Sequence, residues 1–224
     1  MCGRFALSAK TDEIEKLLPE LYSSKDIKPN YNIAPTNQVA VITNNNPKEV
    51  TFAHWGLIPS WAKDKSIGNK MINARAETLH EKPSFRNLFS KRRCLIIADG
   101  FYEWKKTEGS KRKQPYFIKM KTGEPFTFAG LWDTWKNPDG DMVTSTVIIT
   151  TDPNEIMTTI HNRMPVIILP EERKLWLSEI INNFELSKLL IPFPSDSMIA
   201  YPVSDLVNSP GFNSPQNIAG IENQ

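Results

Sequence analysis

The chain has 224 residues, 40% of them hydrophobic, and a formal net charge of +2. This length and composition predict a single globular protein with a sizeable core, and two cysteines exclude a disulfide-rich secreted framework. No apolar run approaches the roughly 18 residues that a membrane helix needs, so we expect a cytoplasmic protein without a membrane partner.

Short apolar runs separated by Gly, Pro and Asn predict a compact, mostly antiparallel β core with a few helices, which is an α+β fold. Helical spacing is seen after Thr11, taken as an N-cap, and over residues 154–160, 171–177 and 183–190. We expect one domain at 1–208 and a flexible tail at 209–224. The expected strands are Val39–Thr43, Glu49–Trp55, Arg93–Ala98, Phe101–Lys105, Tyr116–Met120, Phe126–Leu131, Ser145–Thr150 and Val166–Leu169.

Charge is distributed unevenly along the chain. Residues 61–121 hold 16 Lys and Arg against 6 Asp and Glu, whereas the remaining residues hold 11 against 19. A basic face on a near-neutral protein is typical of a protein that binds a polyanion. Ordinary solvated loops explain the same pattern equally well.

The N-terminal sequence begins Met1-Cys2-Gly3. Removal of Met1 would leave Cys2 with a free amine and a free thiol on adjacent carbons. Such a 1,2-aminothiol captures an aldehyde as a ring, because both nucleophiles reach the same carbon. Alternatively, Cys2 is a small apolar residue at the start of a strand, as most free cysteines are.

Three further segments carry polar side chains among apolar or aromatic neighbours. Asn73 and Arg75 alternate, so an extended segment would place both on one side, where an amide and a guanidinium suit a sugar oxygen beside a phosphate. Glu103 lies between Tyr102 and Trp104, which favours a proton-transfer role or a plain strand residue. His161 offers an imidazole that exchanges protons near neutral pH.

Two segments are loop-like and rich in aromatic residues or proline. They are 31–35, which ends at Pro35, and 55–61, which ends at Trp61. Exposed Trp and Pro surfaces stack on unpaired bases, and aromatic stacking contributes about 1–3 kcal/mol per base. Packing in the core of a large β protein is the alternative for these side chains.

Taken together, these segments resemble the SRAP family, the SOS response-associated peptidases, which includes bacterial and animal abasic-site processing proteins. The resemblance extends to about Val207, and six separated motifs in one order make a chance match remote. The motifs are Met1-Cys2-Gly3-Arg4-Phe5, Tyr31-Asn32-Ile33-Ala34-Pro35, Trp55-Gly56-Leu57-Ile58-Pro59, Asn73-Ala74-Arg75-Ala76-Glu77, Asp99-Gly100-Phe101-Tyr102-Glu103-Trp104 and His161-Asn162-Arg163-Met164-Pro165.

The resemblance implies a barrel-like β core with a basic cleft for single-stranded DNA. It also implies a thiazolidine cross-link between Cys2 and the aldehyde of an abasic deoxyribose. By resemblance, Asn73 positions Cys2 or the sugar, Glu103 transfers protons, and His161 assists sugar ring opening. The implied DNA contacts are Arg4, Arg75, Arg163, Pro35 and Trp61.

The same resemblance implies a lyase side activity, through elimination from the imine, and a peptidase activity that removes Met1. We expect no cofactor and no metal, and we expect a monomer. Two alternatives explain fewer residues. An N-terminal nucleophile amidohydrolase, such as a glutamine amidotransferase, also uses an N-terminal cysteine but leaves Asn73 and Glu103 unexplained. A non-catalytic single-strand binding module predicts reversible, salt-sensitive binding that does not need Cys2.

Overall fold

The computed structural model describes residues 2–19, 27–107, 109 and 112–221. Within these residues, five strands close into a barrel, since each pairs with the next and the last returns to the first. They are β3 (Gln38–Thr43), β4 (Asn46–Trp55), β6 (Arg93–Ala98), β9 (Phe126–Lys136) and β10 (Met142–Thr151). The pairing of β10 with β4 is parallel and the others in this ring are antiparallel.

The barrel interior follows from runs of apolar and β-branched residues. β6 is buried along its whole length, from Arg93 to Ala98, as expected for a strand covered on both faces. Gly130 in β9 allows the neighbouring strand to approach closely. A Cβ at this position would lie 2.8 Å from Cys94 Sγ, so a larger residue would push β6 and β9 apart.

A second, antiparallel sheet has the strand order β13-β8-β7-β1-β2. Its strands are β1 (Phe5–Leu7), β2 (Asn30–Ile33), β7 (Gly100–Lys106), β8 (Lys113–Met120) and β13 (Met198–Pro202). Asp99 alone links β6 of the barrel to β7 of this sheet, and its backbone N–H donates to Ala6 O at 2.8 Å. The Asp99 carboxylate accepts from the Ser8 hydroxyl at 2.6 Å and the Ala9 N–H at 3.0 Å. Asp99 therefore ties the connection between the two sheets to the C-terminal end of β1.

Three short strands extend the barrel sheet next to this junction: β5 (Asn73–Arg75), β11 (Met164–Pro165) and β12 (Ile167–Ile168). β5 pairs parallel with β10, and β11 pairs antiparallel with the C-terminal end of the same strand. Buried Trp55 donates its indole N–H to Ile72 O at 3.0 Å, which fixes the chain immediately before β5.

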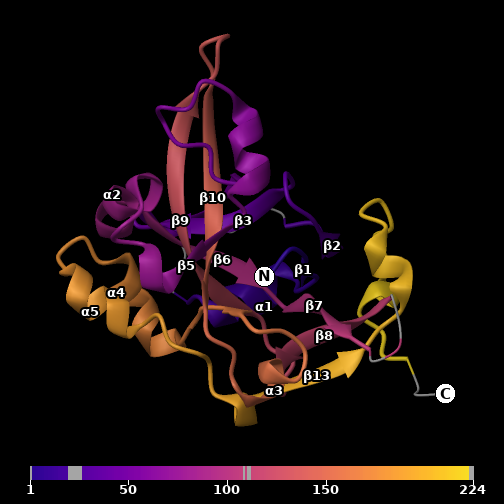
Figure 1. The fold of residues 1–224 in the computed structure, drawn as a ribbon. Helices are drawn as coiled ribbons and strands as arrows, with labels where there is room; N and C mark the ends of the chain where they lie inside the picture. The colour runs from indigo at the N-terminus through magenta and orange to yellow at the C-terminus, as the bar shows by residue number, and fades with distance from the viewer. Residues whose placement is uncertain (1, 20–26, 108, 110–111, 222–224) are drawn as a thin grey trace.

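Helices surround the two sheets. α2, α4 and α5 lie together on the left of the barrel, whereas β7, β8 and β13 lie to the lower right (Figure 1). The α-helices are α1 (Thr11–Leu17), α2 (Pro83–Lys91), α3 (Glu155–Thr158), α4 (Arg173–Leu177) and α5 (Asn183–Lys188). The 3-10 turns are η1 (Lys65–Lys70), η2 (Ala76–Thr78), η3 (Pro170–Glu172), η4 (Ser195–Ser197), η5 (Asp205–Asn208) and η6 (Pro215–Asn217). Among the described residues, none of the helices is both long and apolar enough to span a membrane.

The predicted α+β fold with a mostly antiparallel, barrel-like core is confirmed, and each expected strand overlaps an observed one. Two local predictions were wrong. The loop expected at 31–35 is strand β2 up to Ile33, because the side chain of buried Asn32 is paired within the protein. The N-cap of α1 is Lys10 rather than Thr11, and the Lys10 N–H donates to the Glu13 carboxylate at 2.7 Å.

Residues 209–221, which belong to the tail that we expect to be flexible, contact the edge strand β2. Asn32 Nδ2 donates to the carbonyls of Ser209 and Phe212, and the Tyr31 N–H donates to Asn213 Oδ1 at 2.8 Å. Asn217 is fully buried. The amide-rich composition that predicts disorder thus supplies partners for the edge strand β2, while residues 222–224 lie outside the described part of the chain.

Candidate active site

Four of the predicted residues meet where the two sheets join. Asn73 begins β5, and His161 lies between α3 and β11, both on the barrel side. Cys2 precedes β1, and Glu103 lies in β7, both in the second sheet. The Tyr102 N–H donates to Arg4 O at 2.9 Å, which continues the β1–β7 ladder toward Cys2. The path of the chain through the two sheets therefore brings Cys2 and His161 to one junction, although 159 positions separate them in the sequence.

Asn73 holds the backbone of Cys2. Its Nδ2 donates to Cys2 O at 2.7 Å, across the junction of the two sheets. Asn73 is itself fixed by the pairing of β5 with Ile148 in β10. Its Oδ1 is buried and has no hydrogen-bond partner among the described residues, so it is available to accept a hydrogen bond. One amide thus anchors Cys2 and offers a free acceptor beside it.

Glu103 and His161 form the second contact across the junction. Glu103 Oε2 lies 4.0 Å from His161 Nε2, and the Glu103 side chain is only 3% exposed against 23% for His161. The Arg163 backbone N–H donates to His161 Nδ1 at 3.1 Å, and the backbone N–H of His161 donates to Met157 O at 2.7 Å. Arg163 O also lies 3.3 Å from Nδ1, so the backbone of Arg163 offers this ring nitrogen both a donor and an acceptor. In the tautomer that accepts from the Arg163 N–H, the ring proton is on Nε2, which faces Glu103.

The Cys2 thiol is in a setting that keeps it protonated. Cys2 is fully buried, and this burial, together with the nearby Glu103 carboxylate, raises the pKa of its thiol far above the ordinary range. Its Sγ donates weakly to Arg4 O at 3.7 Å. The thiol therefore needs a neighbouring base before it reacts at neutral pH.

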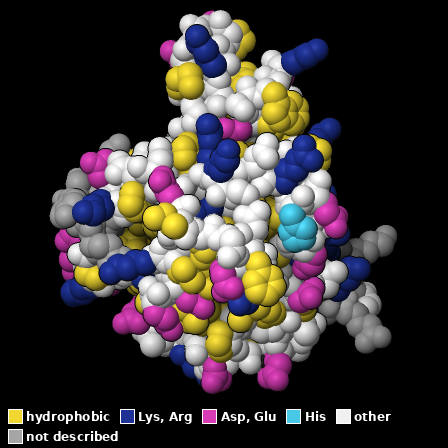
Figure 2. Space-filling model, turned by 90° about the vertical axis from the view of Figure 1, so that its left-hand side faces the viewer, with side chains coloured by type: hydrophobic (Ala, Val, Ile, Leu, Met, Phe, Trp, Pro, Cys, Tyr) yellow, Lys and Arg dark blue, Asp and Glu magenta, His cyan; other side chains and the backbone are white. Residues whose placement is uncertain are grey.

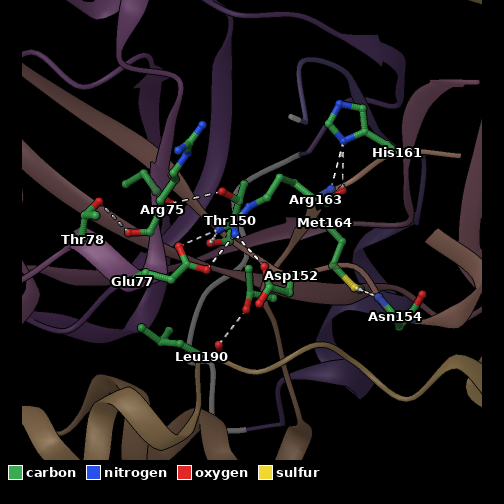
Figure 3. Close-up of polar contacts among 12 residues, drawn as sticks. Arg75, Glu77, Thr78, Thr150, Asp152, Asn154, His161, Arg163, Met164 and Leu190 are labelled. Carbon is green, nitrogen blue, oxygen red and sulfur yellow. Dashed lines mark hydrogen bonds and ion pairs between the residues drawn. The ribbon is translucent and has the colours of Figure 1, made fainter. Parts of the chain in front are cut away.

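The three arginines that we expect to contact phosphate lie in different environments. Arg4 is half-buried and donates to Asn32 Oδ1 at 2.7 Å and to Val207 O at 2.9 Å. Arg75 is exposed, and Figure 3 shows its guanidinium directed away from the other labelled side chains. Arg163 is only 12% exposed and is held by protein acceptors. Of the three, Arg75 has the most accessible charge.

Pro35 and Trp61 lie on loops. Pro35 is half-buried and precedes Thr36, whose φ of +75° is the one positive value at a non-glycine among the described residues. Trp61 is 62% exposed and lines a surface cavity of about 460 Å³ together with Lys63 and Lys70. An exposed indole among lysines suits base stacking beside a phosphate chain.

The loop that leads to Trp61 is fixed by two glycines. Gly56 has a φ of +131°, and a Cβ there would lie 2.6 Å from the carbonyl oxygen of Gly68 in η1. The Leu57 N–H donates to Met71 O, and the Ile58 N–H donates to Ser145 Oγ. The loop is therefore held against η1 and β10.

Sequence reasoning assigned no role to several residues that build the site. Asn32 orients Arg4, and Trp55 fixes the start of β5. Glu77 binds Arg163 with both carboxylate oxygens, and Asp152 contributes a third contact. The position of Glu77 in the same motif as Asn73 was a usable signal, whereas nothing in the sequence around Asp152 pointed to Arg163.

The excess of basic residues at 61–121 is spread over separate elements. It includes α2 on one side of the molecule and the β7–β8 hairpin on the other (Figure 1). On the face shown in Figure 2, acidic side chains gather in the lower half and basic ones are spread over the upper half. The basic cleft stays a prediction. Within the described residues, no three His, Cys, Asp or Glu side chains are grouped as metal ligands.

Known proteins resemble this chain along most of its length. The family model "SOS response associated peptidase (SRAP)" matches residues 1–210. The chain is 47% identical to the abasic site processing protein YoqW of Bacillus subtilis, covering 97% of this chain and 99% of that protein. It is 30% identical to the abasic site processing protein HMCES of Rattus norvegicus, covering 98% of this chain and 76% of that protein.

A solved structure shares the whole architecture. The crystal structure of a protein from Bacteroides thetaiotaomicron superposes with a TM-score of 0.88 at 30% identity, covering 99% of this chain and all of that one. The fold, the matched family model and the relatives that align along nearly the full length lead to one conclusion. The chain belongs to the SOS response-associated peptidase (SRAP) family.

Proposed function

We propose that this protein processes abasic sites in DNA by capturing the abasic deoxyribose covalently on Cys2. The observation that carries the proposal is the position of Cys2, whose carbonyl is held by Asn73 while Glu103 and His161 lie beside it. The names of the relatives support the same substrate class, since both YoqW and HMCES are described as abasic site processing proteins.

The proposed reaction begins after removal of Met1, by the protein itself or by an aminopeptidase. The freed Cys2 amine attacks the C1′ aldehyde of the ring-opened sugar, and the resulting carbinolamine loses water to give an imine. The Cys2 thiol then adds to the same carbon, its proton goes to the nitrogen through a neighbouring base, and a thiazolidine ring closes. The net change is aldehyde plus aminothiol to thiazolidine plus one water.

Each central residue has a task in this sequence. Asn73 positions Cys2 through its carbonyl, and its unpaired Oδ1 accepts from the freed amine. Glu103 takes the proton of the thiol, and His161 donates the Nε2 proton to the sugar oxygen that leaves C1′ on ring opening. Elimination of the 3′ phosphate from the imine would give a lyase side activity.

DNA is proposed to bind as a single strand to a monomer. Arg75 is exposed next to Asn73, and Trp61 offers a stacking surface, so both suit contacts on either side of the lesion. Arg4 is tied to Asn32, which places its charge near the N-terminal end of β1.

Denaturing gel electrophoresis tests the proposal directly. The protein, shown by mass spectrometry to lack Met1, is mixed with single-stranded DNA carrying one abasic site, and we expect a shifted band that survives heating. Cys2→Ala keeps the α-amine but removes the thiol. It should therefore give a band only after borohydride reduction of the imine, and no heat-stable band without it.

Two controls make the outcome decisive. DNA with a tetrahydrofuran site has no aldehyde and should give no band, and a variant with one extra N-terminal residue should also give none. Absence of a stable band from the wild-type protein without Met1 would exclude capture by the aminothiol. A band of equal strength from the extended variant would show that another nucleophile reacts.

A further inference from the structure

We infer that three side chains of the β9–β10 hairpin are positioning residues for DNA binding, because they hold Trp61 as a rigid stacking surface for an unpaired base. They are Asp133, Trp135 and Ser145. This inference rests on the proposed function, which places single-stranded DNA beside Trp61. It starts from the contrast between the exposed Trp61 side chain and the closely held backbone around it.

Asp133 and Trp135 hold the two residues that flank Trp61. Asp133 Oδ2 accepts from the Ser60 N–H at 2.8 Å, and the Trp135 indole N–H donates to Ala62 O at 2.7 Å. Both of these β9 side chains are buried, whereas the indole of Trp61 is mostly exposed. The backbone is thus fixed immediately before and after an aromatic ring that is open to solvent.

The hairpin side chains are themselves held in place. The second oxygen of Asp133, Oδ1, accepts from the Arg92 guanidinium and from the Thr134 N–H. Asp133 lies opposite Ser145 in the β9–β10 pair, and the fully buried Ser145 accepts from the Ile58 N–H at 2.8 Å. In Figure 1, β9 and β10 rise side by side at the top, with the segment that contains η1 beside them. The hairpin therefore offers this loop a row of fixed partners.

The same loop is tied to the chain that leads to the active site. The Leu57 N–H donates to Met71 O at 3.0 Å, two residues before Asn73. Asn73 in turn donates to Cys2 O at 2.7 Å. The position of Trp61 is therefore set relative to the anchor of Cys2.

A rigid and exposed indole favours stacking for an entropic reason. A side chain that is already ordered loses little conformational freedom when a base stacks on it. The cavity beside Trp61 is also lined by Lys63 and Lys70, whose charges suit the phosphates of the same strand. Loosening the loop would leave the indole present but make its ordering part of the cost of binding DNA.

Affinity for single-stranded DNA with an unreactive tetrahydrofuran site tests this inference. Trp61→Ala should weaken binding about fivefold or more, because it removes the stacking surface. Trp135→Phe keeps an aromatic ring but loses the N–H that bonds Ala62 O, and it should weaken binding about threefold. The matched control is Trp132→Phe on the same strand, which loses an indole hydrogen bond of 3.0 Å to Asn44 and should not change the affinity.

A double-mutant cycle separates positioning from general destabilisation. In a Trp61→Ala background, Trp135→Phe should have no further effect on DNA affinity, because the side chain that it positions is absent. An equal loss in both backgrounds would overturn the inference, and so would full affinity in a folded Trp135→Phe variant.

Asp133→Asn gives a second, independent variant. In either orientation its amide would direct an NH₂ group at a donor, either the Ser60 N–H or the Arg92 guanidinium. We expect it to weaken DNA binding in the same way as Trp135→Phe, and only when Trp61 is present. A loss that persists without Trp61 would show that Asp133 acts by another route.

A fluorescent base reports stacking without a measurement of affinity. With 2-aminopurine on one side or the other of the tetrahydrofuran site, fluorescence at saturating protein should be lower for wild type than for Trp61→Ala with at least one of the two strands. Trp135→Phe should recover part of the difference and Trp132→Phe none. Equal fluorescence of wild type and Trp61→Ala with both strands would overturn the inference.

The same experiments distinguish this inference from the proposed function. A wild-type protein that binds tetrahydrofuran DNA but does not cross-link to abasic DNA would exclude capture by Cys2, while the affinities and fluorescence would still decide the role of the hairpin. A wild-type protein that does not bind single-stranded DNA would overturn both.

Discussion

At the scale of single residues, Glu103 has two opposite effects on Cys2. Its negative charge disfavours the thiolate, and it is the second cause, after burial, of the raised pKa of the Cys2 thiol. In the proposed reaction the same carboxylate accepts the thiol proton, which requires a carboxylate close to sulfur. In this proposal, suppressing the free thiolate would protect Cys2 from unrelated electrophiles, and Glu103 would accept the thiol proton once the imine has formed.

This dual effect predicts that Glu103→Gln changes two rates in opposite directions. Removing the charge lowers the pKa of the Cys2 thiol, so alkylation of Cys2 by iodoacetamide at pH 8 should become several-fold faster. Cross-linking to abasic DNA should become at least tenfold slower, because a positioned general base is lost. Peptide mass spectrometry gives the alkylation rate. Cys94 is the internal control, since burial raises the pKa of its thiol to about 12 without a contribution from Glu103.

Asn73 allows a sharper test of anchoring. Asn73→Asp keeps the size of the side chain but replaces the donor to Cys2 O with an oxygen, so two acceptors would face each other. We expect the rate constant of cross-linking to abasic DNA to fall about tenfold or more. Affinity for single-stranded DNA with an unreactive tetrahydrofuran site should change little. A loss confined to DNA affinity would instead assign Asn73 to the sugar alone.

At the scale of elements, one arginine joins the helices on the left of the barrel to β6. Arg93 is fully buried, and its guanidinium donates to the carbonyls of Phe89 and Ser90 at the end of α2 and of Trp176 and Ser178 at the end of α4. These carbonyls are left unpaired where the helices end, and a cation is favoured there. Arg93 therefore completes two helix ends at once.

Arg93→Lys should lower the free energy of unfolding by about 2–4 kcal/mol, because a single ammonium cannot reach both helix ends and each unpaired buried carbonyl costs about 1–3 kcal/mol. Urea denaturation followed by circular dichroism measures the loss. Arg92→Lys is the matched control, since Arg92 is more exposed and pairs with Asp133, and it should cost less than about 1 kcal/mol. Equal losses in the two variants would contradict the bridging role.

The elements differ in how far sequence predicts them. β6 and β9 are long apolar runs, and their pattern predicts them well. α2 was missed although Phe85, Leu88 and Phe89 have helical spacing behind Pro83, so this signal was present but unused. β2 was not predicted, because a polar residue such as Asn32 does not look buried in the sequence. Its side chain is satisfied by the carbonyls of Ser209 and Phe212, which are far away along the chain.

At the scale of the whole molecule, the site is also a joint between two sheets. The Asn73–Cys2 hydrogen bond and the Glu103–His161 contact both cross from the barrel to the second sheet. Motif resemblance named the four residues, but spacing alone could not show which of them meet, because their proximity depends on how the sheets join at Asp99. Asp152 was missed for the same reason.

The ion pair of Glu77 predicts how stability depends on pH. Because Arg163 lowers the pKa of Glu77 below its unfolded value, the pair stabilises the fold at neutral pH, and this contribution is lost as pH falls through the lowered pKa. The difference in unfolding free energy between wild type and Glu77→Gln should therefore be larger at pH 7 than at pH 3. Burial raises the pKa of Asp99 and acts in the opposite sense, but it is common to both proteins and cancels in the difference. A difference that stays constant over this range would argue against a charged Glu77–Arg163 pair.

The short lead from β1 to Cys2 limits what the reactive residue can reach. Only Gly3 and Arg4 separate Cys2 from the first strand. Even if this segment is fully extended, Cys2 lies no more than about 10 Å from Phe5. Cys2 therefore has little freedom to move, and in the proposed reaction the abasic sugar would have to move out of its strand to reach it. A captured strand would in turn be held rigidly against the barrel, shielding the lesion from other enzymes for as long as the bond lasts.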